Sequence, residues 1–109
     1  MVSQQAFTIA RRAAETSEEQ QNAWYNLAWF YAARNDAVRV EVCLRRSANA
    51  SPNWFKPHWV LAQVLLLAGR RTEALAEAAR AAELDGGKDP EIARFLQTLH
   101  HYPESSKAE

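Results

Sequence analysis

Histidine and paired carboxylates are the side chains of this 109-residue chain that could supply an acid, a base or a metal ligand. His100 and His101 are adjacent, so a helix would direct them to different sides, and His58 has no second ligand three or four residues away. Glu73 and Glu77 would share one helical face, which we expect to be solvated. No phosphate-cradling glycine loop or nucleophile elbow accompanies them. We therefore expect no catalytic residue, cofactor or metal site, and a protein that is not an enzyme.

Aromatic side chains offer the other chemistry, that of a binding surface. Tyr25, Trp29 and Trp59 each combine a large flat contact area with a hydrogen-bond donor at one end, and such residues anchor protein interfaces. The same rings could instead pack against neighbouring helices. The sequence leaves both interpretations open.

These residues lie on helical patterns whose clearest example runs from Trp54 to Asp85. Apolar residues recur at helical spacing in two segments, and Gly69 stands between them where a left-handed residue would end the first helix. The stretch therefore predicts a tight antiparallel hairpin. The alanines that would let its two backbones approach closely are Ala62, Ala74, Ala78 and Ala81.

The sequence repeats at an offset of 34 residues. Extended in both directions, the same register takes in residues 4–15 and 90–101. A fixed period of this size is typical of stacked helical hairpins. The shift superposes Leu27 on Leu61, Ala28 on Ala62, Tyr31 on Leu65, Asn35 on Gly69, Val40 on Ala74, Leu44 on Ala78 and Ser47 on Ala81.

This pattern resembles the tetratricopeptide repeat. It departs from that repeat at Asn35, Val40, His58 and Gly86, and asparagine tolerates the left-handed turn expected at position 35. The matching residues are Trp24, Leu27, Ala28, Tyr31, Leu44, Ser47 and Pro52 within 21–54, and Leu61, Ala62, Leu65, Gly69, Ala74, Ala78 and Ala81 within 55–88.

The resemblance implies an all-α fold, a right-handed superhelical stack of antiparallel helix hairpins with about six helices, formed by one domain over residues 4–101. We expect helices over 22–34, 37–50, a segment ending near Ala68, 72–84 with Thr72 as N-cap, and 91–101. Because the first repeat lacks its first helix, we expect an excised piece of a longer protein, or else a small protein with an atypical cap. The divisions of the domain are 4–15 as the second helix of a truncated repeat, 21–54 and 55–88 as repeats, 90–101 as a capping helix and 102–109 as a polar tail.

In the family that the chain resembles, the first helices of the hairpins line a concave groove that binds a protein or peptide. Asn26 and Lys56 also match two positions of the carboxylate clamp of some members, but Val60 replaces the clamp arginine, so we expect no clamp. The residues that the resemblance places in the groove, and that we predict to bind a partner, are Tyr25, Asn26, Trp29, Lys56, Trp59, Gln63, Arg94 and Gln97.

The composition limits the classes of partner that the chain is expected to bind. The 13 basic and 13 acidic residues cancel, so no net positive field favours nucleic acid. The single cysteine, Cys43, cannot form an internal disulfide, and we expect it to pack as an ordinary helix residue. The longest apolar run, 59–69, is shorter than the roughly 20 residues that a bilayer span needs. We expect a soluble segment that does not insert into a membrane, in a compartment that the sequence does not indicate.

The stretch NWFKPHWVLAQVLLLAGR, with the following EALAEAARAAELDGG, also resembles the C-terminal repeat region of bacterial O-antigen ligase or polymerase family proteins. That resemblance implies attachment to an inner-membrane protein of glycan assembly. Two functions remain open: a protein-interaction module that binds a peptide or helix in its groove, and a structural spacer that self-associates through exposed end faces.

Overall fold

The structure is a computed structural model that describes residues 19–101 of the chain. All secondary structure in this part is helical, which confirms the expected all-α class. The expected helix over 4–15 and the tail 102–109 lie outside the described residues. The helices are α2 (Gln20–Ala32), α3 (Ala37–Ala50), α4 (Phe55–Leu67), α5 (Arg71–Asp85) and α6 (Pro90–His101).

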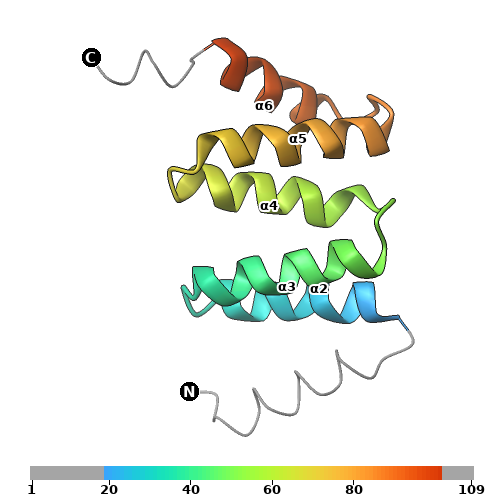
Figure 1. Cartoon of the computed structure of the whole chain (residues 1–109), viewed down its shortest axis with the longest axis vertical. Coiled ribbons are helices and arrows are strands. Elements are labelled where there is room, and N and C mark those ends of the chain that lie inside the picture. The colour runs from blue at the N-terminus through green and yellow to red at the C-terminus, as the bar shows by residue number, and fades with distance from the viewer. Residues whose placement is uncertain (1–18, 102–109) are drawn as a thin grey trace, which may run out of the picture. The chain divides into compact units, whose positions relative to one another are not determined.

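The chain forms two compact units that divide between Pro52 and Asn53. Their division falls close to the boundary expected between the two full repeats, at 54 and 55. Helices α2 and α3 belong to the first unit, and α4, α5 and α6 to the second (Figure 1).

The first unit is an antiparallel hairpin of α2 and α3 (Figure 1). The turn is made by Asn35, which adopts the expected left-handed conformation at φ 59°. The amide of Asp36 donates to the carbonyl of Tyr31 (3.1 Å), and this bond closes the end of α2. Helix α2 consequently ends two residues before the predicted Arg34, and it begins two residues earlier than predicted.

Asp36 is the N-cap of α3, whose bounds agree with the prediction. Its carboxylate accepts a hydrogen bond from the amide of Arg39 (3.2 Å) and one from the Arg39 guanidinium (2.6 Å). Such a cap satisfies one of the donors that a helix start leaves unpaired. The core of the unit lies between the helices and is formed by Trp24, Leu27, Ala28, Tyr31, Val40, Cys43, Leu44 and Ala48.

The second unit contains the hairpin of α4 and α5 that the sequence predicts. Gly69 turns the chain at φ 80°, and the amide of Arg70 donates to the carbonyl of Leu65 (2.9 Å) to close α4. The side chains between the two helices are fully or almost fully buried, and those of α5 are all methyl groups, which confirms the expected close approach. They are Leu61, Ala62 and Leu65 of α4 and Ala74, Ala78 and Ala81 of α5.

The predicted N-cap of α5 is wrong. Arg70 occupies that position without a capping side-chain hydrogen bond, and Thr72 already lies within the helix. The cause is local: the left-handed turn at Gly69 leads directly into the helix, and the Arg70 guanidinium pairs with Glu73 (2.7 Å) in the first turn. An ion pair therefore stands where a hydroxyl cap was expected.

Helix α6 packs on α5 (Figure 1). Two of its apolar side chains, Ile92 and Leu99, are buried, and the guanidinium of Arg71 donates to the carbonyl of Leu99 (3.0 Å). The last carbonyls of a helix have no partner within it, so this bond ties the start of α5 to the end of α6. No helix within residues 19–101 has both the length and the apolar character needed to cross a bilayer.

Candidate partner-binding groove

One residue of a predicted surface pair makes a part-buried polar contact between helices instead. Glu73 is exposed as expected, but Glu77 reaches from α5 to α4, where its Oε1 lies 2.7 Å from Nδ1 of His58. The two side chains are only 21 % and 15 % exposed, so the expectation of a solvated face is wrong for Glu77. An ionised carboxylate only accepts hydrogen bonds, so Nδ1 of His58 is the donor to an ionised Glu77.

The geometry of this pair is that of a structural tie between helices. The other ring nitrogen of His58, Nε2, is buried and finds no hydrogen-bond partner in the described part of the chain. A general base must reach the proton that it abstracts, and a buried Nε2 presents no face to a substrate. Among residues 19–101, no three histidine, cysteine or carboxylate side chains come together in a way that could hold a metal ion.

A groove in the second unit brings predicted binding residues together. Its aromatic part is an edge-to-face pair, Trp59 of α4 and Phe95 of α6, with ring centroids 5.0 Å apart and planes at 84°. The cavity measures about 350 Å³ and is open to solvent. We refer to it as the α4/α6 groove; its lining residues are Trp59, Gln63, Glu91, Arg94, Phe95 and Thr98.

Two polar side chains of the α4/α6 groove are held by their own helices. The amide nitrogen of Gln63 donates to the carbonyl of Trp59 (3.2 Å), and the hydroxyl of Thr98 donates to the carbonyl of Arg94 (2.9 Å). Each bond joins residues four apart, which lie above one another on a helix. The Gln63 oxygen and the Thr98 oxygen keep lone pairs that a ligand could use.

Arg94 differs from every other arginine of the described residues. The other seven, Arg34, Arg39, Arg45, Arg46, Arg70, Arg71 and Arg80, each contact a carboxylate, a carbonyl or an aromatic ring. Arg94 is exposed, and no such contact is made by its guanidinium within residues 19–101. The groove therefore presents a fork of N–H donors beside two aromatic rings.

Three of the eight predicted residues, Trp59, Gln63 and Arg94, line this groove together. Lys56 and Gln97 are exposed but do not line it. The prediction missed Glu91, Phe95 and Thr98. Glu91 lies three residues before Arg94 and Thr98 four residues after it, and Phe95 is four residues from Glu91 and three from Thr98. That spacing was available in the sequence. Phe95 stands 34 residues after Leu61, at a repeat position that the family does not use for binding.

The remaining predicted residues lie on α2 in the first unit. Tyr25 and Trp29 form an edge-to-face pair with centroids 6.1 Å apart, and Asn26 is exposed beside them. The Trp29 side chain is 51 % exposed, whereas Trp59 packs against Phe95. Both sequence interpretations of the aromatics therefore apply: Trp29 is a surface ring, and Trp59 both packs and lines a groove.

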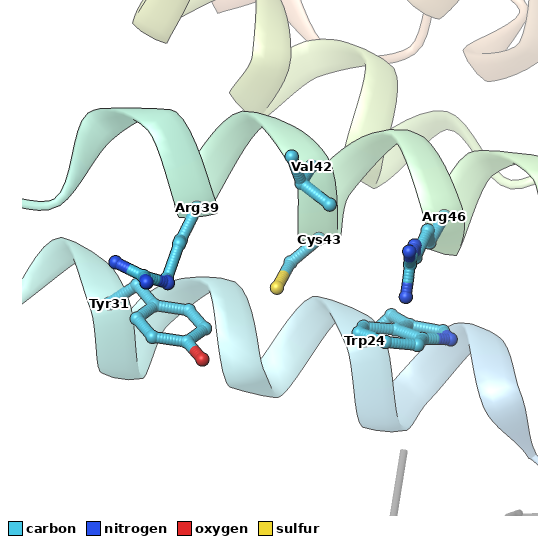
Figure 2. A pocket seen from close by; sticks show the side chains of 6 residues that line it. All are labelled: Trp24, Tyr31, Arg39, Val42, Cys43 and Arg46. Atoms are coloured by element: carbon cyan, nitrogen blue, oxygen red, sulfur yellow. The ribbon is translucent and has the colours of Figure 1, made fainter. Parts of the chain in front are cut away.

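The first unit has a smaller pocket of about 190 Å³ between α2 and α3 (Figure 2). Arg46 lies over the ring of Trp24, with its guanidinium carbon 4.7 Å from the centroid, and Arg39 lies 5.8 Å from that of Tyr31. Stacking on an aromatic face is attractive for a guanidinium. Cys43 points toward α2 between these rings and is buried, as expected for a packed helix residue.

Arg39 also sets the electrostatics at the start of α3. The hydrogen bond from its guanidinium, aided by the one from its amide, lowers the pKa of the Asp36 carboxyl below its ordinary value of 3.8. The same contact raises the pKa of Arg39. Arg39 is thus already occupied by a carboxylate, unlike Arg94.

Comparison with known proteins identifies no family for this chain. Neither the family models nor the curated proteins contain a match to this chain. The assignment of function therefore rests on the repeat and on the geometry of the two units.

Proposed function

We propose that the chain is a tetratricopeptide-like interaction module that binds a peptide or a partner helix in the α4/α6 groove, without catalysis. The observation that carries the proposal is the composition of that groove. An aromatic pair supplies apolar contact area, and Arg94, which has no partner within residues 19–101, supplies directional donors. Aromatic and arginine side chains are the residue types that most often anchor protein interfaces.

The repeat supports the family part of this proposal. The two hairpins turn at residues that stand 34 positions apart, Asn35 and Gly69, and both residues have positive φ. Equivalent turn geometry at equivalent positions is what a repeated unit requires. In the proposed family, hairpins stack into a right-handed superhelix, and Tyr25, Asn26 and Trp29 are the residues of the first unit that the resemblance assigns to partner binding.

The arrangement of the acid–base groups around the two described contacts, His58 with Glu77 and the α4/α6 groove, favours binding over catalysis. His58, the histidine that has a carboxylate partner, holds that partner between helices and has its second nitrogen buried. The α4/α6 groove contains one carboxylate, Glu91, and one guanidinium, but no nucleophile next to a base.

Apolar exposure on α3 favours a second candidate, a spacer that self-associates. Val38 is 75 % exposed and Val42 43 % exposed, and they lie on adjacent turns of one face. Two such residues are a small patch, so we place this function second. Either module would suit the proposed attachment to a protein of O-antigen or other glycan assembly, which rests on the sequence resemblance alone.

The test is selection of binding peptides from a random display library on the immobilised full chain. Affinities of the selected peptides are then measured for the wild type and for Arg94→Ala, Trp59→Ala and Gln97→Ala. We expect a loss of about 30-fold, the equivalent of an interface anchor of about 2 kcal/mol, for each groove variant. Gln97 lies on the same helix outside the groove lining, so Gln97→Ala is the matched control and should change affinity less than twofold.

Two results would contradict the proposal: no peptide is enriched over a blank support, or the selected peptides bind Arg94→Ala as well as the wild type. Arg94 is exposed, and its side chain makes no hydrogen bond, ion pair or ring contact within residues 19–101, so this variant separates loss of binding from loss of folding. Sedimentation analysis of the same samples tests the spacer, which requires association that Val38→Ser and Val42→Ser weaken.

A further inference from the structure

The α4/α6 groove contains two opposite charges that do not pair with each other. Glu91 and Arg94 stand three residues apart on α6, and both line the groove. Oppositely charged side chains at this spacing can meet on the surface of a helix. No ion pair joins these two, however, and neither has another ion-pair partner within residues 19–101. Both charges are therefore available to a ligand in the groove.

The same spacing gives ion pairs elsewhere in the described part of the chain. Three other pairs of opposite charge three residues apart have a nitrogen and an oxygen 2.6, 2.7 and 3.0 Å from each other: Asp36 with Arg39, Arg70 with Glu73, and Arg80 with Glu83. All three pairs lie on partly or fully exposed side chains. Exposure of Glu91 and Arg94 therefore does not by itself explain why they stay apart.

The lining residues of α6 also set the distances between contacts along the groove. Thr98 lies four residues after Arg94, and Arg94 lies three residues after Glu91. At about 1.5 Å per residue, these intervals are about 6 and 4.5 Å along the helix axis. Residues one turn apart on a second helix have the same axial distances, whereas alternate residues of an extended chain are about 6.6 Å apart. A helix alongside α6 therefore matches both intervals, and an extended peptide matches only the longer one.

We propose that the α4/α6 groove binds an amphipathic partner helix that runs antiparallel to α6 and carries three residue types in a fixed order. An apolar residue lies over the aromatic pair, an acidic residue four positions later pairs with Arg94, and a basic residue three positions after that pairs with Glu91. The inference rests on the proposed function, because it specifies which peptides the groove accepts.

Two features of helices favour the antiparallel direction. In this direction the acidic residue of the partner precedes its basic residue, which is the better order with respect to the dipole of the partner's own helix. The free partner is then more helical, and less ordering is needed when it binds. Opposite directions also place the positive N-terminal end of one helix beside the negative C-terminal end of the other.

Charge complementarity gives the size of the expected preference. A partner with the stated order forms two ion pairs in the groove, whereas its isomer with the acidic and basic residues exchanged meets two like charges. Exposed ion pairs change affinity only a few-fold each. Because two attractive contacts are replaced by two repulsive ones, we expect the isomer to bind about tenfold more weakly.

The experiment selects partners on the immobilised full chain from a display library of helical peptides. The peptides are alanine-rich and about 20 residues long, because shorter helices are marginal in water, and the positions of one helical face are randomised. Enriched peptides should carry the order apolar, acidic, basic at the stated spacing. The affinities of one such peptide and of its charge-exchanged isomer are then measured by fluorescence anisotropy.

Exchange of the two groove charges in the chain is the sharpest variant. Glu91→Arg combined with Arg94→Glu keeps the net charge, and the isomer should then bind about tenfold more tightly than the selected peptide. Loss of folding cannot invert a preference, so it cannot imitate this result. Arg80→Glu combined with Glu83→Arg exchanges a pair of the same spacing outside the groove lining, and this matched control should keep the wild-type preference.

Equal affinity of the two isomers for the wild type would overturn the inference, and so would a wild-type preference for the exchanged isomer. Failure of the proposed function is distinguishable from these results. If the random peptide library yields binders that depend on Arg94 but the helical library yields none, only the helical partner is refuted. If neither library yields a binder, the groove is refuted as a partner site.

Discussion

Substitution of Ala62 by leucine tests the packing on which the second unit depends. Ala62 lies on α4 and has no exposed surface, and Ala74, Ala78 and Ala81 of α5 are likewise fully buried. Facing methyl groups let two helices approach more closely than larger side chains would. Leucine adds three carbon atoms at a position where the structure has no solvent-filled space to receive them.

Two opposing terms set the magnitude of this effect. Burial of three more carbon atoms in existing space would stabilise the fold by about 2 kcal/mol. That space is missing at Ala62, so α5 or the new side chain must move, and overpacking of this kind destabilises by about 1 to 3 kcal/mol. We expect the second effect to dominate, because the residues opposite are already alanines and cannot become smaller without creating glycines in a helix.

Thermal unfolding followed by circular dichroism measures the result. For a domain of 60 to 100 residues, 1 kcal/mol corresponds to a change in Tm of about 4 to 8 °C, so Ala62→Leu should lower Tm by at least about 4 °C. Ala76→Leu is the matched control, because Ala76 is an exposed position of α5 and leucine and alanine differ little in helix propensity. A Tm for Ala62→Leu equal to that of Ala76→Leu would refute the close pairing of α4 with α5.

Three further predictions address the polar contacts and the turn. Glu77→Ala should destabilise by about 1 to 3 kcal/mol, measured by urea unfolding, because it leaves Nδ1 of the part-buried His58 ring without its partner; a midpoint equal to wild type would contradict this. The lowered pKa of Asp36 makes its contact with Arg39 stabilising above the unfolded-state value of 3.8, and this contribution is lost as pH falls through the lower folded-state pKa. Asp36→Asn should therefore remove part of the acid dependence of Tm below pH 3.8, and an unchanged acid profile would refute the assignment. Gly69→Ala should destabilise by about 1 kcal/mol, because φ is 80° and the penalty for a left-handed Cβ applies even though the space is open; a gain in Tm would show that the turn adopts another conformation.

The sequence was sufficient for the features that local chemistry controls. The left-handed turns at Asn35 and Gly69, the bounds of α3 and the buried alanines of α4 and α5 follow from residue type and from the repeat. Each of these features depends on backbone preference or on helical spacing. Backbone preference and helical spacing can both be recognised without knowledge of a contact between distant residues. The arrangement of hairpins into a superhelix remains a proposal.

Contacts between helices were not predictable in the same way. The pairing of His58 with Glu77 depends on how two helices are rotated about their axes, and the spacing of residues within one helix does not report that rotation. The lining of the α4/α6 groove illustrates the same limit. Family positions selected Gln97, whereas the groove follows the face of α6 that contains Glu91, Arg94 and Thr98.

The repeat nevertheless relates the His58–Glu77 contact of the second unit to two positions of the first unit. A shift of 34 residues places His58 on Trp24 and Glu77 on Cys43. In the first unit that pair is apolar and lines one pocket, whereas in the second it is a hydrogen-bonded imidazole and carboxylate (Figure 2). The same two repeat positions therefore lie between the helices of both hairpins, while the chemistry that they supply differs from one hairpin to the next.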